Sequence, residues 1–172
     1  SDPEKKDSFE IAVRGCGNVT NQLIKLLPCD TIKIRGPYGN GWSIAKMLGQ
    51  NVVLIAGGIG LFPIRPLVYE MIRYKNEFKK ITLIYGSKTD EHLLFENDLF
   101  DWAKKIDVKI VCEFTSGKEN IEKGMITKPI KELNIKKNTI VCMCGPEGMF
   151  SFCSDELLKK DIQKKNIYIS FE

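Results

Sequence analysis

The chain has 172 residues and a mass of 19.5 kDa, enough for one domain or at most two. Apolar residues make up 43% and charged residues 28%, which excludes intrinsically disordered, collagen-like and low-complexity chains. The formal net charge is +4, and the lysines are spread along the chain without alternating aromatic residues, so we expect no nucleic-acid partner.

Residues 1–42 have the pattern of two isolated strands around a short helix. Phe9, Ile11 and Val13 alternate as in a strand, a helical stretch from Val19 to Leu27 follows, and residues 31–35 (TIKIR) alternate again. Two strands do not form a stable sheet in water. We therefore predict that residues 1–42 are the C-terminal part of a β-rich domain, and that residues 36–42 (GPYGNGW) join it to the next domain.

From residue 52 onward, short apolar runs alternate with amphipathic stretches. The runs predict buried strands at 52–56, 81–86, 108–114, 139–144 and 167–171, and the stretches predict helices at 63–77, 94–105, 126–133 and 146–160. This alternation predicts an α/β fold with a five-stranded, parallel, doubly wound sheet over residues 43–172. Ligands of such sheets bind beyond the carboxyl ends of the strands.

The loop after the first predicted strand, GGIGLFP (57–63), carries the strongest functional signal. Gly58 and Gly60 allow a tight turn and close approach of the backbone to a pyrophosphate, whose charge the free amides of the next helix would meet. Pro63 suits a first helical turn. The pattern predicts a dinucleotide-binding loop, and the alternative is an ordinary strand-to-helix turn.

Two further loops fall at the same edge of the predicted sheet. CGPEGM (144–149) follows the fourth strand and would place Cys144 as an exposed thiol at the crevice, the alternative being a small buried residue. YGSKT (85–89) ends the second strand, where no acidic residue is available for a ribose hydroxyl. Ser87 and Lys88 could instead meet a 2′-phosphate, or Lys88 could be an ordinary surface lysine.

The cysteines, the N-terminus and the hydropathy suggest a cytoplasmic protein. The chain has one histidine, His92, and its six cysteines contain no C-x-x-C pair, so we expect reduced thiols and no metal site. The charged start, SDPEKKD, is unlike a signal peptide, and no apolar run approaches the ~18 residues of a membrane span.

Taken together, GGIGLFP, YGSKTDEHLLFENDL and CGPEGM resemble the ferredoxin-NADP reductase family, and FEIAVRGCGNVTNQL with GPYGNGW resembles the end of its FAD-binding β-barrel. The resemblance covers nearly the whole chain. It is strongest to the iron-sulfur-linked electron-transfer subunits of three enzymes: sulfhydrogenase (its gamma subunit), anaerobic sulfite reductase and dihydroorotate dehydrogenase. In these relatives a two-iron two-sulfur module follows a segment like IYISFE, so we expect it downstream of Glu172.

The resemblance implies a cofactor role for several residues. The predicted nicotinamide dinucleotide site comprises Gly57, Gly58, Ile59, Gly60 and Pro63 for the pyrophosphate, Gly86, Ser87 and Lys88 for the adenosine, and Cys144, Gly145, Pro146, Glu147 and Met149 beside the nicotinamide. The predicted FAD contacts are Gly17, Val19, Thr20, Pro37, Tyr38 and Gly39. Two residues depart from the family pattern: Phe62, expected to narrow the crevice, and Glu147, which replaces a proline.

The implied activity is electron transfer. A hydride passes between NADH or NADPH and FAD, and single electrons then pass to an iron-sulfur centre and a catalytic subunit of a multi-subunit oxidoreductase. The cofactors carry this chemistry, so the protein needs alignment rather than an acid-base pair, and Cys144 would contribute packing and polarity. The alternatives are the reductase component of an oxygenase and a nucleotide-binding module without catalysis.

Overall fold

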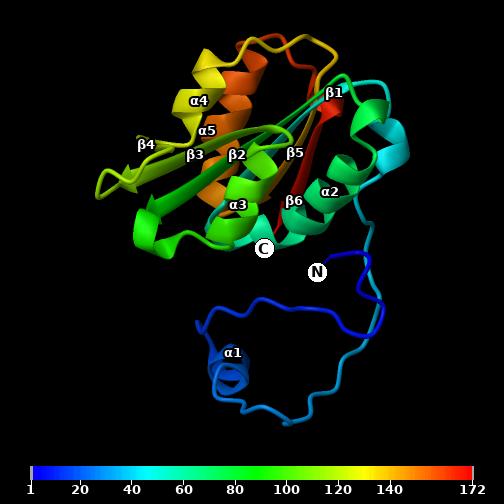
Figure 1. Ribbon diagram of the computed structural model, residues 1–172, viewed down its shortest axis with the longest axis vertical. Coiled ribbons are helices and arrows are strands. Elements are labelled where there is room, and N and C mark those ends of the chain that lie inside the picture. Colours follow the sequence, from blue (N-terminus) through cyan, green and yellow to red (C-terminus); the bar gives the residue numbers. More distant parts are fainter. Residues whose placement is uncertain (1, 172) are drawn as a thin grey trace.

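The computed structural model describes residues 2–171 and contains one six-stranded parallel sheet (Figure 1). The strand order is β4-β3-β2-β1-β5-β6, which confirms the predicted doubly wound α/β fold. The strands are β1 (Asn51–Gly57), β2 (Lys80–Thr89), β3 (Asp107–Phe114), β4 (Ile121–Lys123), β5 (Ile140–Gly145) and β6 (Ile167–Phe171). The prediction of five strands was wrong by one, because β4 is only three residues long and two of them are charged.

Helices cover both faces of the sheet (Figure 1). They are α2 (Leu61–Arg73), α3 (Glu96–Ala103), α4 (Thr127–Glu132) and α5 (Glu147–Leu158), with single 3₁₀ turns at Ile44–Lys46, Gly58–Gly60, Lys75–Glu77, Asp90–His92 and Lys164–Asn166. Buried residues of α2 and α3 pack on one face, and those of α4 and α5 on the other. Along β1, Leu54 faces the first cluster whereas Val53 and Ile55 face the second, the two-residue period of a strand buried on both sides.

The N-terminal part lacks the two strands that its sequence pattern predicts. Residues 2–50 contain one α-helix, α1 (Asn18–Leu23), and no strand. In Figure 1 the blue part of this segment, which includes α1, forms an open loop away from the sheet, whereas Met47, near the end of the segment, is buried in the core. Phe9, Ile11 and Ile34 are largely exposed. The expected strands at 9–13 and 31–35 were therefore wrong for this structure, since no strand within residues 2–171 pairs with them and isolated strands lack ladder partners.

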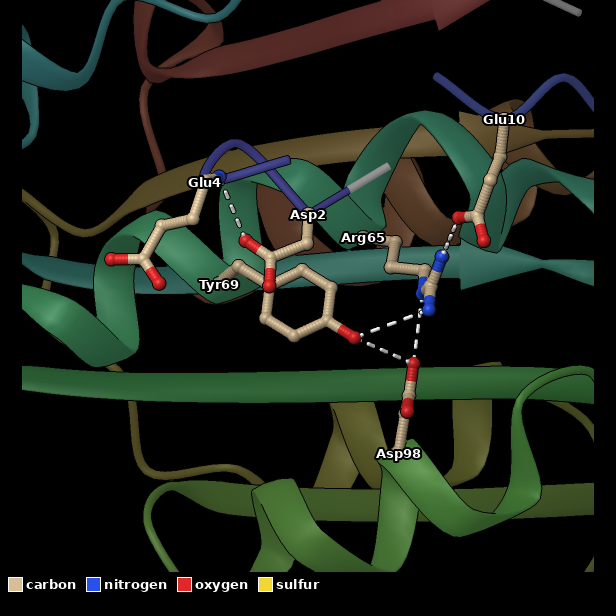
Figure 2. A network of polar contacts seen from close by, with 6 residues as sticks. All are labelled: Asp2, Glu4, Glu10, Arg65, Tyr69 and Asp98. Atoms are coloured by element: carbon tan, nitrogen blue, oxygen red, sulfur yellow. Dashed lines mark hydrogen bonds and ion pairs between the residues drawn. The ribbon is translucent and has the colours of Figure 1, made fainter. Parts of the chain in front are cut away.

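A buried arginine ties the N-terminal part to the helices (Figure 2). Arg65 of α2 is 8% exposed, and its Nε donates a 2.8 Å hydrogen bond to Asp98 of α3. Its guanidinium also forms an ion pair with Glu10, donates to the Tyr69 hydroxyl at 3.1 Å and lies 4.1 Å from the ring centroid of Phe95. Two carboxylates thus compensate the burial of one positive charge, and α2, α3 and the N-terminal part meet at this side chain.

Candidate functional site

A cavity of about 600 Å³ opens at the carboxyl edge of the sheet, on the face covered by α4 and α5. The ends of β1, β2 and β3 contribute its floor, and α4, the segment before it and one side of α5 along its length contribute its sides. The lining residues are Gly57, Gly58, Gly86, Ser87, Lys88, Val111, Glu113, Gly124, Met125, Ile126, Thr127, Lys131, Pro146, Gly148, Met149, Phe152, Asp155, Glu156 and Lys159. This is the edge at which parallel α/β sheets bind ligands.

Two glycines side by side form part of the cavity floor. Gly57 of β1 pairs with Gly86 of β2 in the ladder. A Cβ at Gly57 would lie 2.6 Å from the sulfur of Met149, and one at Gly86 would lie 2.9 Å from Cδ1 of Ile126. Because Gly57 and Gly86 have no side chains, Met149 and Ile126 can pack close to the sheet. These close contacts define the shape of the cavity.

The two glycines of the turn after β1 have different roles. Gly58 adopts φ +54° with open space around it, and it lines the cavity. Gly60 is buried, and a Cβ there would lie 2.3 Å from the carbonyl oxygen of Cys144. Gly58 therefore offers its backbone to a ligand, whereas Gly60 allows the turn to pack directly on β5.

The start of α5 presents backbone amides to the cavity. Pro146 precedes the helix with extended backbone, and Gly148 in the first turn is exposed, with no atom within 4 Å of where its Cβ would lie. The first amides of a helix have no intrahelical acceptor, and they attract anions. A phosphate or another anionic group of a ligand would therefore be stabilised at this end of α5.

The predicted site residues divide into two groups in the structure. Those that line the cavity are Gly57, Gly58, Gly86, Ser87, Lys88, Pro146 and Met149. Those that do not line it are Ile59, Gly60, Pro63, Cys144, Gly145, Glu147, Gly17, Val19, Thr20, Pro37, Tyr38 and Gly39. Gly39 and Pro63 instead border a second cavity of about 840 Å³ together with Trp42, whose Nε1 donates a 3.1 Å hydrogen bond to the Pro63 carbonyl.

The expectation of an exposed thiol at Cys144 was wrong. The side chain is 0% exposed, and it belongs to the core cluster on the α2 face of the sheet. The cause is that β5 continues to Gly145, so Cys144 is a central strand residue between Ala56 of β1 and Ser170 of β6. The two exposed cysteines are Cys16 and Cys29.

Thiol reactivity checks this assignment. Burial raises the pKa of the Cys142 and Cys153 thiols to about 12, and the thiolate is the reactive form. We expect a thiol reagent such as DTNB to modify two cysteines of the native chain rapidly, Cys16 and Cys29, and to modify the four buried ones only after unfolding. A Cys16→Ser, Cys29→Ser double variant serves as the control. A third rapid thiol mapped to Cys144 by mass spectrometry would contradict the structure.

Phe62 also differs from its expectation. Its ring packs against Phe95 with centroids 5.3 Å apart, and it is not among the residues that line the 600 Å³ cavity. Phe95 belongs to the cluster on the α2 and α3 face, which is the opposite face of the sheet. Phe62 therefore does not narrow this cavity.

Several lining residues were missed by reasoning from motifs, because no glycine loop marks them. Glu113 lies at the end of β3, Met125 and Ile126 lie just before α4, and Phe152 lies one helical turn after Met149 on α5. Met125 and Phe152 are 55% and 62% exposed, so two large apolar side chains border the mouth of the cavity. The available signals were the position of Glu113 at a strand end and the helical spacing of Phe152.

A buried carboxylate orders the loop after β3. Asp90 is 4% exposed and accepts hydrogen bonds from the Ser116 hydroxyl, from the Ser116 amide at 2.9 Å and from the Thr115 hydroxyl at 3.1 Å. These bonds, with those from Ser116 the stronger, lower the pKa of Asp90 from 3.8 to about 2. The chain that leaves β3 after Phe114 is thereby held to the end of β2.

The pH dependence of stability follows from this pKa. Because the folded-state pKa is depressed, the stabilisation by Asp90 is fully present above the unfolded value and is lost as the pH falls through the folded value. We expect the stability difference between wild type and Asp90→Asn, from urea unfolding, to be constant above about pH 5 and to shrink between about pH 4 and pH 2. Asp7→Asn, which removes an exposed carboxylate, is the control. A difference independent of pH down to about 2 would contradict this role.

No helix among the described residues is long and apolar enough to cross a membrane. Within residues 2–171, no three His, Cys, Asp or Glu side chains are grouped so as to hold a metal ion.

Comparison with protein families identifies the class. Residues 54–155 match the oxidoreductase NAD-binding domain, so the chain belongs to this family. The match runs from β1 into α5 and includes the glycine turn and the cavity described above.

Among individual relatives, the gamma subunit of sulfhydrogenase 1 from Pyrococcus furiosus is 32% identical over 100% of this chain and 61% of that subunit. A probable dihydroorotate dehydrogenase B (NAD(+)) electron transfer subunit from Methanocella arvoryzae is 37% identical over 81% of this chain and 49% of that subunit. The chain therefore spans between about half and three fifths of the length of these relatives. The resemblance inferred from the three motifs is confirmed.

Solved structures agree on the fold. The CS-b5R domains of human Ncb5or match with a TM-score of 0.76 at 22% identity, over 92% of this chain and 47% of that one. This likeness shows that the chain shares the fold of the matched part of that protein.

Proposed function

We propose that this chain binds NAD(H) or NADP(H) in the cavity between α4 and α5, as part of an electron-transfer subunit. The subunit passes a hydride between the nicotinamide and FAD. Electrons then reach a two-iron two-sulfur cluster and the catalytic subunit of a multi-subunit oxidoreductase. The named relatives that are subunits of sulfhydrogenase and dihydroorotate dehydrogenase support this wider role.

The cavity itself carries the proposal for the dinucleotide. Gly58 and Gly148, in the first turn of α5, border it without side chains, and each has open space where a Cβ would lie. Such backbone binds pyrophosphate through N–H groups and helix dipoles. The two exposed apolar side chains at the mouth, Met125 and Phe152, suit a flat base, because aromatic and thioether groups contact ring systems favourably.

For FAD, the candidate contacts lie in the N-terminal part. Val19, at the start of α1, and Tyr38 are each 73% exposed, so both side chains are open to a ligand. The neighbouring Thr20 hydroxyl accepts hydrogen bonds from the amides of Cys16 and Gly17, which fixes the backbone there. When bound, FAD would accept the hydride and release electrons singly. Cys144 would support the nicotinamide end only through its backbone, which packs against the turn at Gly60, because its thiol lies in the core cluster on the opposite face of the sheet.

Direct binding tests this function. Isothermal titration calorimetry with NADH and with NADPH is expected to give saturable binding of at least one of them. Circular dichroism confirms in parallel that the chain is folded. A folded chain that gives neither heat nor a shift in melting temperature with either dinucleotide would contradict the proposal. For the electron-transfer role, NADH is expected to bleach the flavin absorbance of the holoenzyme in anaerobic stopped-flow mixing.

A further inference from the structure

The ends of β2 and β3 place a lysine and a glutamate side by side in the cavity. The ladder pairs Ser87 with Cys112 and Thr89 with Phe114, so Lys88 lies level with Glu113. Cys112 points into the core cluster on the α2 face, and alternation along the strand turns Glu113 to the opposite face. Both Lys88 and Glu113 line the 600 Å³ cavity.

These two charges are available to a ligand. Both side chains are exposed, and neither forms an ion pair with any residue of the described range 2–171. Across the cavity, by contrast, Glu156 is already engaged by Lys159 at 2.8 Å. Neighbouring strands lie only about 4.8 Å apart. A group bound beside Lys88 would therefore also meet the carboxylate of Glu113.

The charges around the cavity do not favour an additional phosphate. Three lysines and three carboxylates line it: Lys88, Lys131, Lys159, Glu113, Asp155 and Glu156. Among the lining residues from β2 and β3, Glu113 is the one carboxylate, and Lys88 is the one cation. A 2′-phosphate in this place would gain one attraction and suffer one repulsion, whereas a ribose hydroxyl can donate a hydrogen bond to the carboxylate.

We propose that Glu113 is a specificity-determining residue that makes the cavity select NAD(H) over NADP(H). The inference rests on the proposed dinucleotide site. Glu113 accepts a hydrogen bond from a ribose hydroxyl of the adenosine, a role that an acidic residue about 20 residues beyond the glycine loop has in other dinucleotide-binding folds. Here the carboxylate would come from β3, which is separated from β1 by β2. It also repels a 2′-phosphate, so Lys88 alone does not produce a preference for NADPH.

Dissociation constants for NADH and NADPH, measured by calorimetry at one ionic strength, test the inference. We expect the wild-type chain to bind NADH about tenfold more tightly than NADPH, since a like charge at short range disfavours the phosphate. Glu113→Gln is expected to weaken NADH binding and strengthen NADPH binding, so that the preference falls to about twofold or less. Glu119→Gln removes an exposed carboxylate that does not line this cavity and is expected to leave the ratio unchanged.

The outcomes separate the inference from the function on which it rests. Wild-type binding of NADPH as tight as that of NADH, or an unchanged ratio in Glu113→Gln, overturns the role of Glu113 and leaves the dinucleotide site in place. An equal change of ratio in Glu119→Gln shows a general charge effect and also overturns it. Binding of neither dinucleotide by the folded wild-type chain overturns the proposed function and the inference together.

Discussion

Gly60→Val is expected to prevent stable folding of the domain. A Cβ at this position would lie 2.3 Å from the carbonyl oxygen of Cys144 and 2.6 Å from the amide nitrogen of Gly145. These are backbone atoms of the central strand β5, which cannot move aside as the end of a side chain could. We expect a loss of about 3 kcal/mol or more in the free energy of unfolding, at the upper end for overpacking in a core.

The measurement is urea unfolding followed by circular dichroism, with Gly148→Ala as the matched control. At Gly148 nothing lies within 4 Å of where a Cβ would be, and the residue is in a helix. Alanine at this position is expected to preserve the fold and to raise the free energy of unfolding by up to about 1 kcal/mol. Native stability in Gly60→Val would show that the turn does not pack on β5 as described.

Gly148→Glu is expected to abolish most dinucleotide binding while leaving the fold intact. The new carboxylate would stand in the first turn of α5, where an acidic side chain is compatible with the helix dipole. It would also project into the cavity, where the phosphates of the ligand are proposed to bind. We expect the dissociation constant for NADH to rise about 30- to 100-fold, because unfavourable like-charge contacts cost several kcal/mol.

Gly148→Gln separates charge from size, since glutamine has the shape of glutamate without its charge. It is expected to weaken NADH binding much less, and Gly148→Ala is expected to bind NADH normally. Calorimetric titration of the three variants, with their melting temperatures, gives the comparison. Full NADH affinity in a folded Gly148→Glu chain would place the ligand elsewhere.

Much of the sheet could be predicted because its strands are buried on both faces. Runs such as 52–56 and 139–144 contain mainly apolar residues, many of them β-branched, and each became a central strand. The glycine turn at 57–60 could be located for the same reason, since it directly follows such a run. The short edge strand β4 could not, because Glu122 and Lys123 give no apolar pattern and one neighbouring strand suffices for its pairing.

The side-chain details of the site were less predictable. In the sequence, Cys144 lies at the boundary between a predicted strand and a loop. Because β5 extends one residue further, to Gly145, the Cys144 thiol is buried rather than exposed. Glu113 was overlooked because acidic residues were sought only at the end of the second strand, whereas the adjacent β3 supplies the carboxylate. Such contributions depend on which strands are neighbours, and that order is a property of the fold rather than of any local motif.

The central claim is that a nicotinamide dinucleotide occupies the cavity between α4 and α5, and its location can be measured by ¹H–¹⁵N NMR titration with NADH. We expect the largest shifts for amides around the cavity, including Gly58, Ser87, Met125 and Gly148. Gln50 and Asn166, which border a different cavity, are expected to change little. Shifts concentrated around Gln50 and Asn166, or no saturable shifts at all, would contradict it.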